Sequence, residues 1–214
     1  MQNKEELYLR WQKLAARYCK DQILIESIYN EICKRYNEKT RFYHNLNHIH
    51  TILKEIDKHE ASINKLDTIL FATWFHDIIY NSFRKDNEEK SAECAKTILR
   101  KMKVNETLIT DVSHLILKTK DHVMVSIEES FDCRLFIDCD LLILGAEQSL
   151  YVNYMNNVRK EYRYIPNFIY KKARLKVLKL FIGTESIFKT KILRERYELQ
   201  ARKNLEFEIN LLTH

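Results

Sequence analysis

Apolar residues recur every three or four positions along almost the whole chain, which is the spacing of one buried helix face. No linker, repeat of fixed period or low-complexity tract interrupts the pattern. The pattern predicts about ten helices. The third helix is expected to start near His44 and Asn45. The approximate ranges of the others are 4–17, 21–35, 65–80, 86–102, 105–119, 134–144, 147–164, 166–182 and 189–212.

Glycine and proline are scarce, with 2 Gly and 1 Pro in 214 residues. Sandwiches, barrels and Rossmann folds use these residues at many tight turns, so their scarcity disfavours such folds. We therefore predict an all-α fold, and the length fits a single helical domain over residues 1–214. The 5 cysteines lack Cys-x-x-Cys spacing and indicate reduced thiols rather than disulfides or a thiolate zinc site.

The segment 65–80 is apolar nearly all round, as expected of a helix at the centre of a fold. His76 and Asp77 interrupt this segment. A buried charge is costly unless it is paired or bound to a metal, so this pair needs a neutralising partner. A structural explanation also stays open, because core histidines are common and Asp77 could bond a backbone amide or a lysine.

Further side chains that could complete a metal site lie on both sides of this pair. His44 and His48 come earlier and are four residues apart, so they share a face if both are helical. A mixed imidazole and carboxylate set favours Zn, Fe, Mn or Ni, and an open coordination position would hold a water of lowered pKa. This combination indicates a metal-dependent hydrolase.

Three short strings occur in the order and spacing of a known family. They are Tyr-His-Asn-Leu-Asn-His at 43–48, Trp-Phe-His-Asp at 74–77 and Asp-Cys-Asp-Leu at 138–141. Together they resemble the His…His-Asp…Asp signature of the HD superfamily of metal-dependent phosphohydrolases, and the first is similar to the entry motif of cyclic-nucleotide phosphodiesterases. Further strings at 87–92, 138–145, 151–162 and 201–205 resemble the small bacterial branch of predicted metal-dependent HD phosphohydrolases.

The resemblance implies an HD-domain helical bundle, with a metal-binding core over residues 41–145 and additional C-terminal helices over residues 146–214. It implies that one divalent ion (Mn, Fe, Zn, Ni, Co or Mg) is held by His48, His76, Asp77 and a later aspartate. Asp138 and Asp140 point about 200° apart on a helix, so we do not expect them to serve the same ion. We select Asp140, at the Asp-Leu position of the family pattern, and keep Asp138 in reserve.

Two residues near the expected ligands are candidates for catalysis. By likeness to the phosphodiesterases, His44 could protonate the leaving oxygen. Alternatively, His44 could be a structural histidine at the start of a helix, with its ring bonded to a backbone carbonyl. Glu88 is included as a water-orienting base. Glu89 is instead expected to complete a capping box with Asp86 at the start of its helix.

We expect Arg159 and His122 to bind the substrate. Arg159 could bind phosphate through its bidentate fork, unless it pairs with an acid such as Glu161. Arg41 and Lys118 are weaker candidates for the same role. His122 could also add a ligand for a second metal, although we expect one ion. The other histidines are expected to be structural or to lie at the surface: His50 and His114 in the first class, His59 and His214 in the second.

The expected function is a metal-dependent phosphohydrolase, monoesterase or diesterase, that cuts a nucleotide or other small phosphoester with a metal-activated water. The alternative is a non-catalytic HD-type protein that senses a nucleotide through the same pocket.

The formal net charge is +6 and the pI is about 8.9, but glutamates are interleaved among the lysines and arginines of the last third of the chain. We therefore expect solvated helix faces and no nucleic-acid partner. The apolar run 68–75 is too short to span a membrane, so we expect a cytoplasmic protein without a membrane partner. The C-terminal helices are expected to close the pocket or to form a homodimer contact through their tyrosines.

Overall fold

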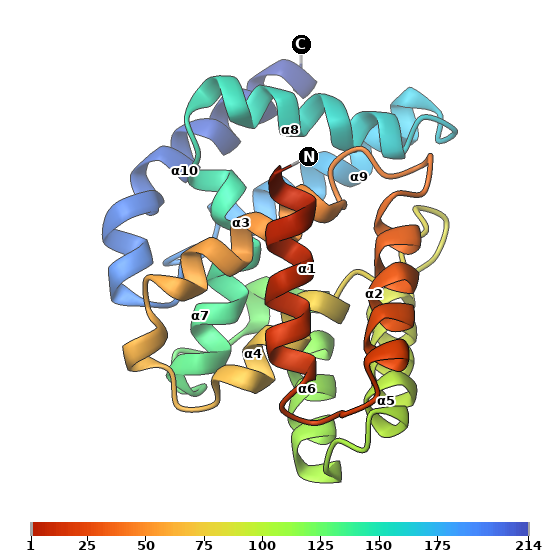
Figure 1. Ribbon diagram of the computed structural model, residues 1–214. Helices are drawn as coiled ribbons and strands as arrows, with labels where there is room; N and C mark the ends of the chain where they lie inside the picture. Colours follow the sequence, from red (N-terminus) through yellow and green to blue (C-terminus); the bar gives the residue numbers. More distant parts are fainter. Residues whose placement is uncertain (1, 214) are drawn as a thin grey trace. The chain divides into compact units, whose positions relative to one another are not determined.

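The computed structural model describes residues 2–213, which form ten α-helices, three short 3-10 helices and no β-strand (Figure 1). The predicted all-α fold is confirmed. The chain divides into two compact units, residues 1–120 and residues 121–214, called here the first unit and the second unit. His214, which we expected at the surface, lies outside the described residues.

The first unit contains six α-helices and one 3-10 helix. Their bounds are α1 Gln2–Ala15, α2 Gln22–Tyr36, α3 Leu46–Asp57, η1 Glu60–Ser62, α4 Leu66–Phe75, α5 Asn87–Lys101 and α6 Glu106–Lys118. Helices α5 and α6 form a hairpin, and α4 packs against both (Figure 1).

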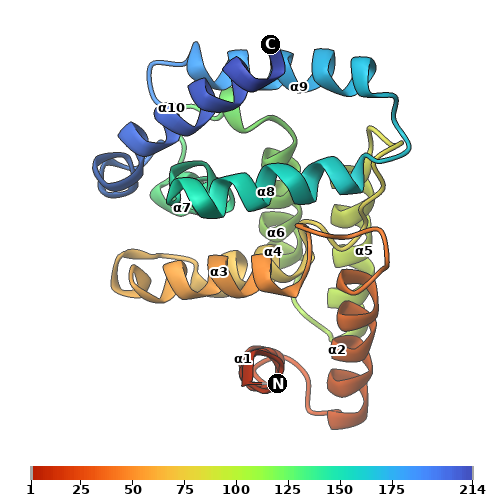
Figure 2. The same cartoon turned by 90° about the horizontal axis from the view of Figure 1, so that it is seen from above.

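The second unit begins where helical geometry breaks. The 3-10 helix η2, Thr119–Met124, contains Asp121 with the non-helical angles φ −140 and ψ 74. The elements that follow are α7 Phe131–Asp140, η3 Leu142–Gly145, α8 Gln148–Glu161, α9 Asn167–Ile182 and α10 Lys191–Thr213. Figure 2 shows α10 crossing α9, against which it packs. The boundary between the units lies inside the range 41–145 that we assigned to a metal-binding core.

Helix α4 forms the centre of the core of the first unit. Phe71, Phe75 and Trp74 are at most 1% exposed. Trp11 of α1 meets these three rings edge-on, at ring-centroid distances of 6.2 Å to Phe71, 5.7 Å to Trp74 and 5.9 Å to Phe75. The all-round apolar pattern of this segment therefore reflects burial, as predicted.

The end of α4 differs from the prediction. We expected a helix over 65–80 with His76 and Asp77 inside it, whereas α4 ends at Phe75 and His76 is its C-cap. The helix ends here because Arg41 donates hydrogen bonds to the backbone carbonyls of Asp77 and Ile78. These carbonyls therefore have hydrogen-bond partners without a further helical turn.

Helix α7 is also shifted from its predicted range of 134–144. The hydroxyl of Ser130 accepts a hydrogen bond from the amide of Cys133 at 3.2 Å, so the helix starts at Phe131. It ends at Asp140, and Gly145 instead closes the short helix η3. Gly145 does not have a positive φ. A Cβ built there would lie 2.5 Å from the Cβ of Tyr197, so a close approach to α10 requires the glycine.

Buried polar contacts join the helices of the second unit. Glu208 of α10 accepts hydrogen bonds from the hydroxyl of Tyr151 at 2.6 Å and from Arg174 at 2.7 and 2.9 Å. The side-chain amide of Asn204 donates to the carbonyls of Leu144 and Ala146, each at 2.8 Å. Tyr151 and Asn204 belong to two of the sequence strings that resemble the HD family, 151–162 and 201–205. In the structure, both residues stabilise the packing of the second unit.

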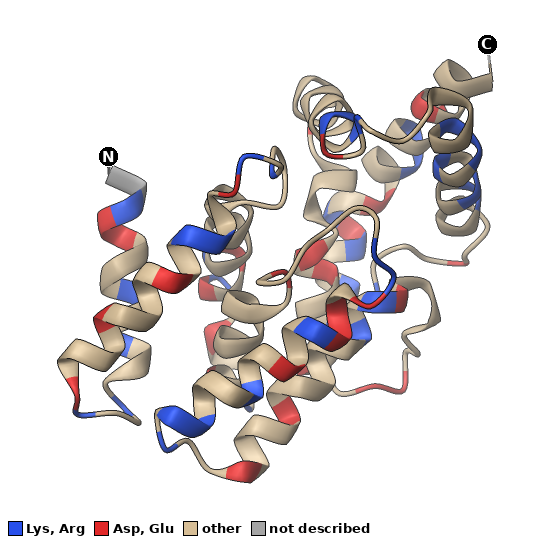
Figure 3. Ribbon diagram, turned by 90° about the vertical axis from the view of Figure 1, so that its right-hand side faces the viewer, with Lys and Arg blue, Asp and Glu red and all other residues tan. Residues whose placement is uncertain are grey.

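Charged residues of both signs are distributed along most of the helices (Figure 3). Among the described residues, no helix combines the length and apolar character needed to cross a membrane. The cysteines are free thiols, and Cys19, Cys133 and Cys139 are buried, in agreement with the prediction of reduced thiols.

Candidate metal centre

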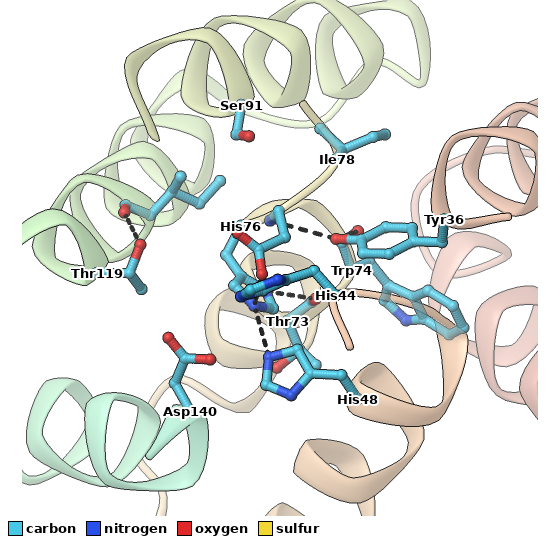
Figure 4. Close-up of polar contacts among 12 residues, drawn as sticks. Tyr36, His44, His48, Thr73, Trp74, His76, Ile78, Ser91, Thr119 and Asp140 are labelled. Carbon is cyan, nitrogen blue, oxygen red and sulfur yellow. Dashed lines mark hydrogen bonds and ion pairs between the residues drawn. The ribbon is translucent and has the colours of Figure 1, made fainter. Parts of the chain in front are cut away.

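Three side chains of the first unit bring their ligand atoms together: those of His48, His76 and Asp77 all lie within 4.8 Å of one another. Figure 4 shows the rings of His48 and His76 next to each other. The Nε2 atom of His76 is 3.2 Å from Nε2 of His48 and 3.2 Å from Oδ2 of Asp77. His48 and His76 are 6% and 1% exposed, whereas 18% of the Asp77 side chain is exposed. The cluster is therefore enclosed around the imidazoles and accessible beside the carboxylate.

A hydrogen bond fixes the tautomer of His76. Its Nδ1 atom lies 3.0 Å from the carbonyl oxygen of Thr73, one turn earlier at the end of α4. A carbonyl only accepts, so Nδ1 must carry the proton, and Nε2 of the neutral ring presents a lone pair to His48 and Asp77. This outward hydrogen bond is the arrangement that orients metal-binding histidines in proteins.

The donor set fits a divalent ion. With bonds of about 2.0–2.1 Å to nitrogen, two ligands of one ion lie roughly 2.9–3.3 Å apart for angles between 90° and tetrahedral. Both 3.2 Å separations around His76 fall in this range. An imidazole lone pair that faces a carboxylate oxygen and a second imidazole nitrogen at these distances requires a proton or a cation between them. Two imidazoles and one carboxylate suit the metals favoured by the sequence.

Arg41 holds the segment that carries Asp77. Its buried guanidinium donates through Nη1 to the carbonyls of Asp77 at 2.5 Å and His44 at 3.3 Å, and through Nη2 to the carbonyl of Ile78 at 2.9 Å. The hydroxyl of Tyr36 accepts from the amide of Asp77 at 3.3 Å and lies 3.2 Å from the carbonyl of Trp74. Arg41, one of our weaker phosphate candidates, is therefore engaged by the backbone around the cluster.

The start of α3 positions His48. Asn45 caps this helix, because its side-chain oxygen accepts from the amide of Asn47 at 2.9 Å and its side-chain amide donates to the carbonyl of Phe42 at 3.0 Å. The helix starts at Leu46, as expected from the apolar pattern. His48 thus lies in the first turn of α3, on its buried side.

His44 lies beside the cluster but outside α3. Its ring is stacked on Tyr80 at a centroid distance of 4.2 Å and an interplanar angle of 26°, and its centroid is 6.1 Å from that of His48. The two histidines are therefore neighbours, although they do not share a helix face as the spacing had suggested.

Glu88 and Glu89 have different surroundings. Burial and the nearby charge of Asp77 raise the pKa of Glu88, which places this carboxyl within electrostatic reach of the cluster. The predicted capping box is wrong: Asp86 makes no capping hydrogen bond and instead forms a bidentate pair with Arg84 at 2.7 Å. Glu89 pairs with Lys120, which lowers the pKa of its carboxyl.

The two later aspartates have different roles within the second unit. Asp138 is fully buried, and its carboxylate accepts from the amides of Lys189 and Thr190 at 2.6 and 2.7 Å and from the Thr190 hydroxyl at 2.6 Å. Burial raises the pKa of Asp138 to about 6, against the opposing effect of these hydrogen bonds. Asp140 pairs with Nε2 of His122 at 2.7 Å. The carboxylate of Asp138 thus has a structural role in the core of the second unit. The assignment of Asp140 as a metal ligand stays a prediction.

Arg159 is engaged with the backbone after α8. It donates to the carbonyls of Tyr162 at 2.6 Å and Ile165 at 3.2 Å, and its guanidinium carbon lies 4.7 Å from the centre of the Tyr170 ring. Phosphate binding by Arg159 and by His122 remains a prediction from the sequence.

The other histidines are placed partly as expected. His50 pairs with Glu6 at 3.2 Å. His114, expected to be structural, is exposed on α6, whereas His59, expected at the surface, is half-buried against Glu55 at 3.3 Å. None of them belongs to the cluster of three found among the described residues.

Sequence reasoning missed the residues that support the cluster: Tyr36, Thr73 and Tyr80. Thr73 lies three residues before His76, so helix geometry could have suggested its carbonyl as the partner of Nδ1. Tyr36 and Tyr80 belong to segments that meet only in three dimensions, and no local pattern marks them.

Comparison with known proteins adds no relative: no family model, curated protein or solved structure matches this chain.

Proposed function

We propose that this protein is a metal-dependent phosphohydrolase that acts on a nucleotide or another small phosphoester. The observation that carries the proposal is the convergence of His48, His76 and Asp77 on one point, with both separations from Nε2 of His76 equal to 3.2 Å. These three residues would hold one divalent ion. The sequence motif adds Asp140 as a further ligand.

A divalent ion bound there would supply a Lewis acid and a water of lowered pKa. The protein holds the ligands in place: the carbonyl of Thr73 fixes the His76 tautomer, and Arg41 fixes the backbone of Asp77. Even with Asp140 included, four protein ligands would leave coordination positions open on an ion that takes five or six ligands, and open positions distinguish catalytic from closed structural sites. The exposed edge at Asp77 supports approach of a phosphoester from that side.

His44 is proposed as the proton donor to the leaving oxygen. Its ring is held by stacking on Tyr80 beside the cluster, so its position does not depend on the substrate. Glu88, with its raised pKa, is proposed as the base that orients the attacking water. The reaction breaks one bond between phosphorus and oxygen, adds hydroxide to phosphorus and delivers a proton to the leaving oxygen.

The second candidate is a nucleotide sensor that uses the same pocket without turnover. The buried, enclosed imidazoles support a bound ion in either case. What favours catalysis is an additional histidine, His44, whose ring lies 6.1 Å from that of His48, beside the group of three ligands.

The test is product release from a panel of nucleotides, cyclic nucleotides and phosphomonoesters, with protein loaded separately with Mn, Fe, Zn, Ni, Co or Mg. Asp77→Ala is the inactive control, and Asp111→Ala, at a surface pair with Lys65, is the matched control that should keep full activity. Turnover that disappears only in Asp77→Ala supports the enzyme. A metal-loaded protein that binds a panel member without changing it would make the sensor the better account.

A further inference from the structure

Helix α9 presents an unusual combination of side chains to solvent. Over Asn167–Ile182 it carries five basic residues and no acidic residue. Its exposed positions include four large apolar side chains, with exposed fractions between 42% and 75%: Phe168, Ile169, Val177 and Leu180. Exposed apolar side chains are normal singly, but a contiguous group on one helix indicates an interaction surface.

The exposed residues are ordered around the helix. At about 100° per residue, Ile169, Ala173, Val177 and Leu180 form one apolar row, and Lys172, Lys176 and Lys179 form a basic row beside it. Phe168 lies at the far edge of the basic row. The remaining half of the helix is turned inward and contains Tyr170 and Leu178, which are 8% and 1% exposed. We call the outward half, made of these eight residues, the α9 surface.

We propose that the α9 surface binds the headgroup region of an anionic phospholipid bilayer. The lysines would contact lipid phosphates through their ammonium groups, while the apolar row and Phe168 enter the interface between headgroups and acyl chains. Lysine stems can lie along apolar surface with the charge in water, which suits this boundary. The proposal does not depend on the phosphohydrolase activity.

The arrangement favours a flat lipid surface over a partner helix. A partner helix that covered the apolar row would leave Phe168 uncovered, because the basic row separates the two. A flat surface contacts the whole outward half of a helix at once. Tyr164, 66% exposed just before the helix, adds a second aromatic residue of the kind found at membrane interfaces.

A second copy of this chain fits the surface less well. In an antiparallel contact about a twofold axis, the basic rows of the two helices would lie on the same side and repel each other. Our expectation of no membrane partner rested on the lack of a spanning segment. A helix that lies on the membrane surface needs no such segment.

The experiment is co-sedimentation of the full chain with vesicles of equimolar phosphatidylcholine and phosphatidylserine, and with vesicles of phosphatidylcholine alone. The test variant is Lys172→Glu/Lys176→Glu/Lys179→Glu. Its matched control is Lys20→Glu/Lys39→Glu/Lys85→Glu, at exposed lysines of the first unit, since both triple variants reduce the formal net charge of +6 to zero. A third variant, Ile169→Gln/Leu180→Gln, removes apolar contact without changing charge. Circular dichroism checks that each variant is folded.

We expect the wild-type chain to bind the phosphatidylserine vesicles and not those of phosphatidylcholine alone. The α9 triple variant should bind at least roughly tenfold more weakly and the control triple variant within about twofold of wild type, because attraction to anionic lipid acts only near the surface. The apolar double variant should also lose binding by roughly tenfold. The proposal is overturned if the wild type fails to bind, if both triple variants lose binding equally, or if the apolar double variant binds like wild type. Failure of the wild type would favour an acidic protein partner instead.

Discussion

The guanidinium of Arg41 donates a hydrogen bond of 2.5 Å to the main-chain carbonyl of Asp77, a residue 36 positions later. The same side chain reaches the carbonyls of His44 and Ile78, so one buried arginine connects the loop before α3 with the segment after α4. The segment after α4 carries His76 and Asp77, and the loop before α3 leads into the turn that carries His48.

Arg41→Lys should weaken metal binding. A lysine keeps the charge but has a single ammonium group, which cannot reproduce the fork that holds three carbonyls. Loss of a supporting contact of this kind typically reduces metal affinity about 10- to 100-fold. Competition with a chromogenic chelator would measure the affinity. Arg84→Lys, at an exposed pair with Asp86, is the control and should bind metal like the wild type; equal affinity in Arg41→Lys would show that Arg41 has no positioning role.

His76→Ala and Asp77→Ala should each abolish stoichiometric metal while helicity is largely retained. Removal of either residue takes away a ligand and leaves too few donors for tight binding. Elemental analysis of the purified variants, together with circular dichroism, measures both properties. His50→Ala, which breaks only a pair with Glu6, serves as control. Full metal content in both test variants would rule out the assigned site.

Glu208→Gln should destabilise the second unit. The carboxylate is 2% exposed and accepts from both Tyr151 and Arg174, so a neutral amide leaves the buried arginine without its counter-charge. Breaking a buried ion pair typically costs about 3–5 kcal/mol of unfolding free energy. Glu206→Gln, two positions away and exposed, should change stability by less than about 0.5 kcal/mol. Urea denaturation monitored by circular dichroism compares the two, and similar midpoints would contradict the assigned role.

Asp138 should produce a pH dependence of stability between about pH 4 and 6. Its pKa is about 6 in the folded protein against an ordinary value of 3.8. A raised pKa means that the folded state holds the proton more tightly, so this contribution to stability is complete below pH 3.8 and is lost as the pH rises through 6. The difference is on the order of 3 kcal/mol.

Asp138→Asn cannot titrate, so the fall in stability from pH 4 to 6 should be smaller than in the wild type. The comparison requires denaturant curves at several pH values, because the variant also loses hydrogen-bond acceptors and is less stable throughout. Asp111→Asn at the protein surface should keep the wild-type slope. The assigned pKa is wrong if Asp138→Asn keeps that slope too.

Gly145→Ala should be more destabilising than Gly183→Ala. A methyl group at Gly145 would meet the Cβ atom of Tyr197 at 2.5 Å and its carbonyl at 2.8 Å, whereas at Gly183 the nearest atom is a carbonyl at 3.2 Å. Overpacking of this kind typically costs about 1–3 kcal/mol. Thermal denaturation of the two variants gives the comparison, and an unchanged melting temperature for Gly145→Ala would contradict the close contact.

Local patterns in the sequence were sufficient for much of the fold. The three-and-four spacing of apolar residues predicted the helices and the buried centre at α4, and the charged pair in that segment indicated where to look for a metal. The two failed predictions have different causes. The end of α4 is set by Arg41, which is distant in the sequence, whereas the capping box at Asp86 is replaced by a pairing with Arg84, only two residues earlier.

The contacts that support the candidate metal centre were equally inaccessible to local patterns. Stacking of His44 on Tyr80 joins residues 36 positions apart in the chain, and it replaces the shared helix face that we had inferred. The packing role of Asp138 depends on donors 51 and 52 residues later. A motif could indicate two candidate aspartates, but only the fold reveals their partners, which are the amides of residues 189 and 190 for Asp138 and the ring of His122 for Asp140.

The contact of Asp138 with residues 189 and 190 also bears on biosynthesis. While the ribosome is still translating α8 and α9, the carboxylate of Asp138 has none of its three hydrogen-bond donors, because they have not yet been made. Burial of α7 around an unsatisfied carboxylate is unfavourable. The nascent second unit therefore completes its core only after residue 190 has emerged, long after the chain that joins Arg41 to Asp77 is available to fold.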